Sequence, residues 1–143
     1  MPVLVKDIMT RDVKTIGTKA TMADAAAALT KWKIGSLVVT EGKEPIGIIT
    51  EGDVSKCVAK GGDPKKVMVS EKRKKLVTIG MGERVEDAAK LMASAGVKKL
   101  PVMDGKRLVG IVTQTDIVST SFALVTSLKE MVQARYRPPD FEM

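Results

Sequence analysis

The sequence contains an internal repeat, and this repeat constrains the fold more than any other feature. Residues 13–54 align with residues 76–117 at a constant offset of 63 and without a gap, and 14 of the 42 positions are identical. Most other pairs exchange like for like, such as Ile34 with Val97 and Ile49 with Val112. Because an ungapped match of this length does not arise by chance, we expect two units with the same fold.

Each unit reads as strand, helix, strand, strand and helix. In the first unit, residues 13–16, 36–40 and 45–50 have the apolar, β-branched character of strands. Thr21 begins a helix with Asp24 as its capping-box acid, and a second helix runs to about Ala59 before a Gly-Gly-Asp-Pro break. One unit alone would leave a sheet face and two helices poorly buried. The sequence therefore predicts an α+β fold in which two β-α-β-β-α repeats pack sheet to sheet about a pseudo-twofold axis.

The repeat also suggests domain boundaries. We expect the first repeat over residues 1–62, the second over 63–120, and a C-terminal helix and tail over 121–143. The segments before the two first strands should correspond, residues 8–10 to residues 67–69, which makes the second connection four residues longer. Residues 61–75 carry a net charge of +4, which favours a solvated, flexible connector.

The last stretch extends beyond the repeat. From Ser121 to Arg137, one face at helical spacing carries Leu124, Leu128, Met131 and Val132. This face either packs on the chain's own core or forms a dimer contact, and the sequence leaves both open. The Pro138-Pro139 pair should end the helix.

Composition excludes most kinds of enzyme. The chain has no histidine and one cysteine, Cys57, which removes Ser-His-Asp and Cys-His catalysis, disulfides and the usual zinc sites. It has neither a GxxxxGK[ST] nor a GxGxxG phosphate-binding loop. We therefore expect no catalytic residue, no metal and no enzymatic activity.

The charge balance bears on partners and location. A net charge of +7 attracts anions such as nucleotides or nucleic acid. No apolar run approaches the roughly 18 residues that a membrane span needs, and the N-terminus lacks the layout of a signal peptide. We expect a cytoplasmic protein without membrane contact.

Three short motifs, two of them at corresponding places in the repeats, give the chain a family resemblance. Gly47-Ile48-Ile49-Thr50-Glu51-Gly52-Asp53 and Gly110-Ile111-Val112-Thr113-Gln114-Thr115-Asp116 share one pattern, and Leu100-Pro101-Val102-Met103-Asp104 precedes the second. Over about residues 3–120 the chain resembles the cystathionine-β-synthase (CBS) domain family, two copies of which form a Bateman module. It looks like the stand-alone members of bacteria and archaea. The first repeat departs from the pattern with Val38 where the second has Pro101.

The resemblance implies two ligand clefts, each assembled across the repeats. In this family, the Thr-x-x-Asp of one half faces the first strand and the start of the second strand of the other. Carried over, cleft A would hold Thr50, Asp53, Leu76, Val77, Lys98, Lys99 and Pro101. Cleft B would hold Thr113, Asp116, Val13, Lys14, Gly35, Ser36 and Val38. The ligand would be an adenosine compound.

The Thr-x-x-Asp motifs have a second interpretation. Thr50-x-x-Asp53 and Thr113-x-x-Asp116 also match the capping box, which stabilises a helix terminus without any ligand. A carboxylate in this place can instead accept charge-assisted hydrogen bonds from a ribose diol. The two roles can coexist, since Thr can cap the helix while Asp binds.

The clefts differ in charge. Cleft A has Lys98 and Lys99 where cleft B has Gly35 and Ser36. If the lysines face the cleft rather than solvent, phosphate binding should be tighter in cleft A, by about tenfold or more.

These expectations favour a regulatory sensor module rather than an enzyme. The regulatory ligand would be AMP, ADP, ATP or S-adenosylmethionine, with no cofactor in the catalytic sense. Its state would be relayed to a second subunit in a homodimer, or to another protein. The alternatives are nucleic-acid binding through the basic excess, or a purely structural dimerisation unit. With 3% aromatic residues, the chain offers little stacking for single strands.

Overall fold

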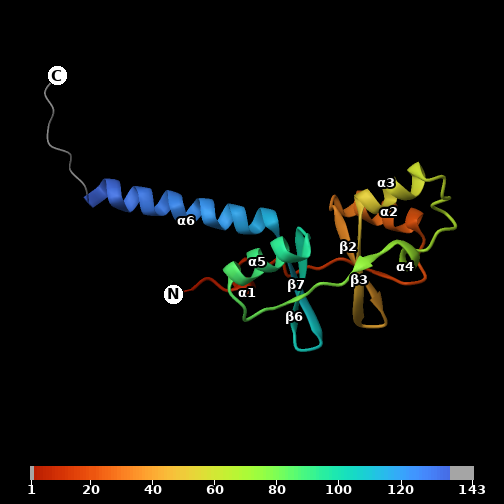
Figure 1. Cartoon of the computed structure of the whole chain (residues 1–143), viewed down its shortest axis with the longest axis horizontal. Helices are drawn as coiled ribbons and strands as arrows, with labels where there is room; N and C mark the ends of the chain where they lie inside the picture. Colours follow the sequence, from red (N-terminus) through yellow and green to blue (C-terminus); the bar gives the residue numbers. More distant parts are fainter. Residues whose placement is uncertain (1, 136–143) are drawn as a thin grey trace, which may run out of the picture.

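The computed structural model describes residues 2–135 and contains the two expected repeats, each with its own sheet. The first repeat consists of β1 (Thr15–Gly17), α2 (Met22–Trp32), β2 (Ser36–Glu41), β3 (Glu44–Thr50) and α3 (Glu51–Ala59). The second consists of β5 (Ile79–Gly80), α5 (Val85–Ala95), β6 (Lys99–Asp104), β7 (Arg107–Thr113) and α6 (Gln114–Arg135). In both sheets the first strand pairs parallel to the second, and the second and third form an antiparallel hairpin. Figure 1 shows the two repeats side by side.

Local sequence signals set the helix boundaries. At α2, Thr21 Oγ1 accepts a hydrogen bond from the Asp24 backbone N–H at 3.2 Å, and Asp24 Oδ2 accepts one from the Thr21 N–H at 2.9 Å. This reciprocal pair is the predicted capping box, and it is confirmed. The helix ends at Lys33, which adopts a left-handed φ of 53°.

Two further short helices each precede one repeat in the sequence but pack on the other repeat. α1 (Val5–Ile8) precedes the first repeat but packs on the second, where Val5 joins the core with Ile79, Ala88 and Leu100. α4 (Val69–Lys72) precedes the second repeat but packs on the first, where Val69 is fully buried. Each repeat therefore completes its core with a segment that the sequence places next to the other repeat.

Backbone hydrogen bonds fix the exchange in the same way on both sides. The Val5 N–H donates to the Glu83 carbonyl at 2.8 Å, and the Val69 N–H donates to the Ala20 carbonyl at 3.0 Å. Further on, Thr10 pairs with Ile111 of β7, while the two-residue strand β4 (Lys74–Lys75) pairs with β3. Ala20 and Glu83 are equivalent positions of the repeat, and so are Ile48, the partner of Lys74, and Ile111.

These contacts correct the expected correspondence of the connecting segments. Val5 and Val69 occupy the same place, which gives an offset of 64, whereas matching residues 8–10 with 67–69 requires 59. The second connection is therefore not four residues longer. Residues 61–75 are mostly exposed, as expected for a solvated connector, but α4 and β4 lie within this segment, so its last part is not an irregular linker.

The two halves meet through the sheet faces that point away from the helices. Leu37 and Val39 of β2 face the first core, so the intervening Val38 points to the opposite face, and it is fully buried there. Pro101 of β6 is the equivalent position and is also fully buried. Sheet-to-sheet packing is thus confirmed, and the sequence difference between Val38 and Pro101 lies in this interface.

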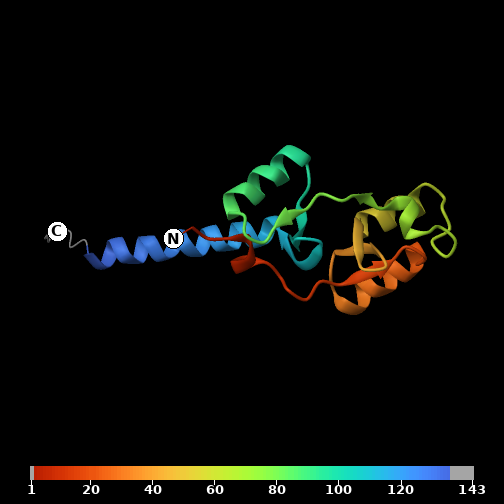
Figure 2. The same cartoon turned by 90° about the horizontal axis from the view of Figure 1, so that it is seen from below.

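α6 is a single helix of 22 residues that continues far beyond the repeat. Its start packs against α1 and α5 through residues such as Ile117, and its remainder projects away from both halves (Figures 1 and 2). The expected division at residue 120 falls inside this helix. The expected end at Pro138-Pro139 lies outside the described residues.

We predict that Gly47→Ala destabilises the protein through the exchanged segment. A Cβ at this position would lie 2.7 Å from the Lys74 carbonyl oxygen and 2.7 Å from Arg73 Cδ, so β4 would have to move away from β3. The expected loss is about 1–3 kcal/mol of unfolding free energy, measured by urea denaturation. The control is Gly17→Ala in β1, where a Cβ meets nothing within 4 Å. Equal stability of both variants would contradict the prediction.

Candidate ligand-binding cleft

The ends of the two hairpins meet where the halves face each other. β2 and β3 pair Ser36 with Thr50, and β6 and β7 pair Lys99 with Thr113. The Lys99 ammonium donates a hydrogen bond to Ser36 Oγ at 3.2 Å. Ser36 and Lys99 are equivalent positions of the repeat, 63 residues apart, so their contact lies on the pseudo-twofold axis.

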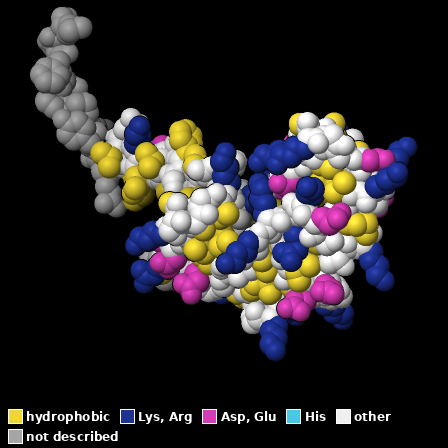
Figure 3. Space-filling model, turned by 45° about the vertical axis from the view of Figure 1, so that its right-hand side comes forward, with side chains coloured by type: hydrophobic (Ala, Val, Ile, Leu, Met, Phe, Trp, Pro, Cys, Tyr) yellow, Lys and Arg dark blue, Asp and Glu magenta, His cyan; other side chains and the backbone are white. Residues whose placement is uncertain are grey.

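A pocket of about 430 Å³ opens beside this contact. Its walls come from the end of β3 and the start of α3 in the first repeat, from β4, and from the approach to β6 in the second repeat. The residues that line it are Gly35, Ile48, Thr50, Glu51, Gly52, Lys74, Lys75, Val77, Gly96, Val97, Lys98 and Lys99. In Figure 3 the lysine and arginine side chains gather where the two halves meet. We keep the name cleft A for this pocket.

The structure brings four of the seven residues assigned to cleft A together in its wall, namely Thr50, Val77, Lys98 and Lys99. Leu76 instead lines a separate pocket of about 750 Å³ beside the hairpin turns. Pro101 is buried between the sheets. Asp53 is not in the wall either, and its small exposed fraction of 8% borders a pocket of about 180 Å³.

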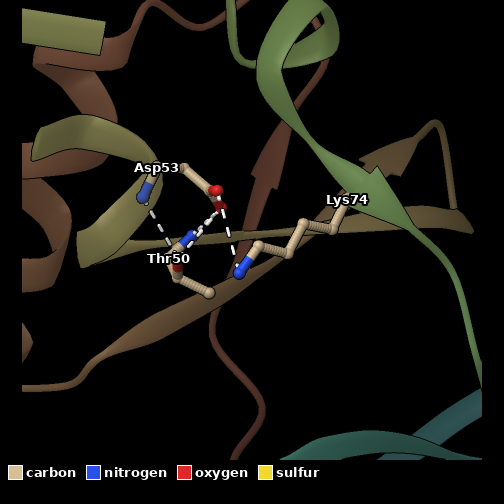
Figure 4. Close-up of polar contacts among 3 residues, drawn as sticks. All are labelled: Thr50, Asp53 and Lys74. Carbon is tan, nitrogen blue, oxygen red and sulfur yellow. Dashed lines mark hydrogen bonds and ion pairs between the residues drawn. The ribbon is translucent and has the colours of Figure 1, made fainter. Parts of the chain in front are cut away.

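The Asp53 carboxylate contacts two residues of the cleft wall, Thr50 and Lys74, and each of its oxygens has a different partner (Figure 4). Oδ2 accepts hydrogen bonds from the Thr50 backbone N–H at 2.8 Å and from Thr50 Oγ1 at 2.9 Å. Oδ1 lies 3.8 Å from the Lys74 ammonium. The capping box at α3 is therefore formed, and it leaves one carboxylate oxygen for another partner.

Lys99 is half-buried, whereas the other three lysines in the wall of cleft A are exposed. Burial lowers the pKa of its ammonium below the ordinary value of 10.5. The Glu51 carboxylate acts in the opposite direction, and the positive charge of Lys74 adds to the lowering of the Lys99 pKa. Of the two expected lysines, Lys99 thus points across the axis rather than into solvent, while Lys98 is exposed and lines the pocket.

The residues assigned to cleft B are more dispersed. Gly35 lines cleft A, Ser36 accepts the hydrogen bond from Lys99, and Val38 is buried between the sheets. Val13 is half-buried. Lys14 lies 3.0 Å from Asp12 and stands 5.1 Å from the centre of the Trp32 ring.

The second Thr-x-x-Asp motif forms the same cap as the first. Asp116 Oδ2 accepts the Thr113 N–H at 2.9 Å, and Thr113 Oγ1 accepts the Asp116 N–H at 3.1 Å. Both residues are half-buried at the start of α6.

Sequence reasoning missed the contribution of β4. Lys74 and Lys75 line cleft A because β4 adds to the edge of the first sheet, and Lys74 pairs with Ile48. A two-residue strand carries no periodic pattern, so the only signal was the density of lysines in the connecting segment. Within residues 2–135 no group of three or more acidic or cysteine side chains could hold a metal ion. No helix in this range is long and apolar enough to cross a membrane.

The chain matches the model of the CBS domain family twice, over residues 5–60 and 68–122. It is 32% identical to a CBS domain-containing protein of Bacillus subtilis, over 79% of this chain and 81% of that protein.

Solved structures with the same fold include two of interest. The hexameric CBS-CP12 protein from bloom-forming cyanobacteria has a TM-score of 0.77 and 38% identity, over 85% of this chain and 73% of that one. The CBS domain pair of protein MJ0100, in complex with 5-methylthioadenosine and S-adenosyl-L-methionine, has a TM-score of 0.77 and 30% identity, over 86% of this chain and 98% of that one.

Lys99 should make stability depend on pH in a defined direction. Between its lowered pKa and 10.5, folded Lys99 holds fewer protons than unfolded Lys99, so its contribution to the free energy of unfolding rises with pH. We expect wild-type stability to rise relative to that of Lys99→Met across this window. Urea unfolding from neutral pH to pH 10.5 measures both curves, and parallel curves would show that Lys99 is not desolvated.

Proposed function

The chain belongs to the CBS domain family, and from this membership we propose that it is a regulatory module whose cleft A binds an adenosine-containing ligand. The observation that carries the proposal is the composition of the cleft wall. The start of α3 comes from one repeat and Lys98 and Lys99 come from the other, so one ligand would contact both. The solved CBS pair with 5-methylthioadenosine and S-adenosylmethionine supports the ligand class.

Asp53 Oδ1 is the group that we assign to the ribose. The other oxygen of this carboxylate, Oδ2, accepts two hydrogen bonds from Thr50, which fix the carboxylate in one orientation. A diol hydroxyl would donate to Oδ1 in a charge-assisted hydrogen bond. Val77 and Ile48 would supply the apolar surface for a purine. Lys98, Lys99 and the N-terminus of α3 would bind the phosphate groups.

Ligand binding would be relayed through the relative position of the halves. Within residues 2–135, the side-chain hydrogen bond at the axis joins Lys99 to Ser36 in a half-buried place, beside the apolar packing of the two sheets. A ligand that bridges both hairpin ends would bind one arrangement of the halves better and shift the equilibrium toward it. The readout would be a second subunit or another protein.

We propose binding without a reaction. The wall of cleft A contains one carboxylate, that of Glu51, and neither of the two Thr-x-x-Asp acids is in this wall. The two acids cap different helices in different repeats. Glycoside hydrolysis needs two carboxyl groups on either side of one bond, and these residues do not supply such a pair.

Self-association is proposed through α6. Seven large apolar side chains along it, Val118, Phe122, Leu124, Val125, Leu128, Met131 and Val132, are each exposed by about half or more. They share one broad face of the helix over about 21 Å, and yellow side chains mark the projecting helix in Figure 3. A second α6 would cover this face in a twofold dimer, with the same surface on both subunits. The hexameric relative supports self-association.

Asp53→Asn should abolish stabilisation by an adenosine ligand. A ligand at 100 times its Kd adds about 2.7 kcal/mol, which raises the melting temperature of a chain this size by roughly 5–10 °C. The matched control is Asp24→Asn, which removes the capping acid of α2 but lies outside cleft A. Both variants should melt lower, and only Asp24→Asn should keep the ligand shift in a thermal scan against AMP, ADP, ATP and S-adenosylmethionine.

If the ligand no longer raised the melting temperature of either variant, the effect of Asp53→Asn would be explained by the loss of a helix cap, and a binding role for Asp53 would be contradicted. Asp116→Asn tests cleft B in the same scan. An unchanged ligand shift in that variant would assign the binding to cleft A alone, and a reduced shift would assign part of it to cleft B.

Leu128→Lys should convert a dimer into a monomer. The change places an ammonium group in the centre of the apolar face, where a second helix would have to bury it. Thr126→Lys adds the same charge on the opposite face of α6 and should leave the dimer intact. Sedimentation equilibrium measures both, and equal masses for the two variants would contradict a role for this face.

A further inference from the structure

The wall of cleft A carries an excess of positive charge, which a neutral ligand would leave without a counter-charge. Lys74 and Lys75 reach it from β4, Lys98 and Lys99 reach it from the start of β6, and Glu51 is the one acidic residue in the wall. Lys74, Lys75 and Lys98 are exposed and Lys99 is half-buried, so repulsion among the four positive charges is least screened at Lys99. Desolvation and the charge of Lys74 already lower the pKa of Lys99.

Lys74 stands between this cleft and the carboxylate that the ligand needs. It lines the cleft, whereas Asp53 does not, and its ammonium faces the one Asp53 oxygen that the cap leaves free (Figure 4). The separation of 3.8 Å and the 55% exposure of the Lys74 side chain make this a weak ion pair. A hydroxyl that approaches Asp53 Oδ1 must therefore displace Lys74, at a small cost.

We propose that Lys74 is a specificity-determining residue, which makes cleft A select adenosine ligands that carry several phosphate charges over neutral or cationic ones. A polyphosphate gives the displaced Lys74 a new anionic partner and also neutralises Lys75, Lys98 and Lys99. A ligand without phosphate would break the ion pair between Lys74 and Asp53 and offer Lys74 no new anionic partner. The Lys74 ammonium would then lie near three other lysines without a counter-charge. The inference rests on the proposed function of cleft A, and it narrows the ligand to nucleoside di- and triphosphates.

The selection is a property of this chain rather than of the repeat. At the positions related to Lys74 and Lys99 by the pseudo-twofold axis, the sequence has Thr10 and Ser36. The MJ0100 pair binds 5-methylthioadenosine and S-adenosylmethionine, neither of which carries phosphate. We expect cleft A to bind both compounds more weakly than ATP.

Lys74→Met tests the inference because it should move two affinities in opposite directions. Methionine keeps an unbranched stem of similar length at β4 and removes the charge. Titration calorimetry without divalent cations should show that ATP binds about fivefold or more weakly, since one phosphate partner is lost. 5-Methylthioadenosine should bind about two- to fivefold more tightly, since Asp53 no longer has a competitor.

Two controls separate this effect from a loss of structure or of net charge. Lys66→Met removes one charge from the exposed part of the same connecting segment, outside the cleft, and should change neither affinity. Lys74→Arg keeps the charge and should keep the preference for ATP. Retention of that preference in Lys74→Met, or a change of both affinities in the same direction, would overturn the inference. If the wild type binds neither ligand, the proposed function of cleft A fails instead.

Discussion

The structure depends on the exchange of two short helices between the repeats. Neither repeat has a complete core without the other's preceding segment, because Val5 fills the second core and Val69 fills the first. The exchange also determines where the connecting strand runs. After α4 packs on the first repeat, β4 must cross the edge of the first sheet to reach the second repeat, and this path brings Lys74 and Lys75 to the cleft. The charge of the proposed site is therefore a consequence of how the halves are joined.

The structure shows how one carboxylate can support a helix and still face a ligand. Capping and ligand binding are often treated as alternatives for a Thr-x-x-Asp motif, but a carboxylate has two oxygens. Asp53 Oδ2 takes both hydrogen bonds from Thr50, and this fixes the direction of Oδ1 without using it. A residue fixed in this way loses little conformational entropy on binding. The stability of α3 and the geometry of the proposed site therefore depend on the same side chain.

The sequence allowed us to predict the repeated elements, because their apolar periodicity and caps are local signals. The repeat alignment placed α2, β2, β3 and α3 and their counterparts, and the caps at Thr21 and Thr50 formed as expected. It could not show which core a four-residue helix joins, since α1 and α4 are too short to carry a periodic pattern. The offset of these segments and the placement of Lys74 were missed for this reason. The places of Leu76 and Gly35 also depend on how the halves dock, which local patterns do not encode.

The contact between Ser36 and Lys99 limits how alike the two repeats can be. A side chain on a twofold axis meets its own counterpart, so two copies of one sequence would place identical groups against each other there. A lysine in place of Ser36 would put a second positively charged side chain against Lys99 in a half-buried environment, and the two like charges would repel each other. A serine opposite a lysine instead forms a donor–acceptor pair. The most symmetric point of the molecule is thus one where its two halves differ in sequence.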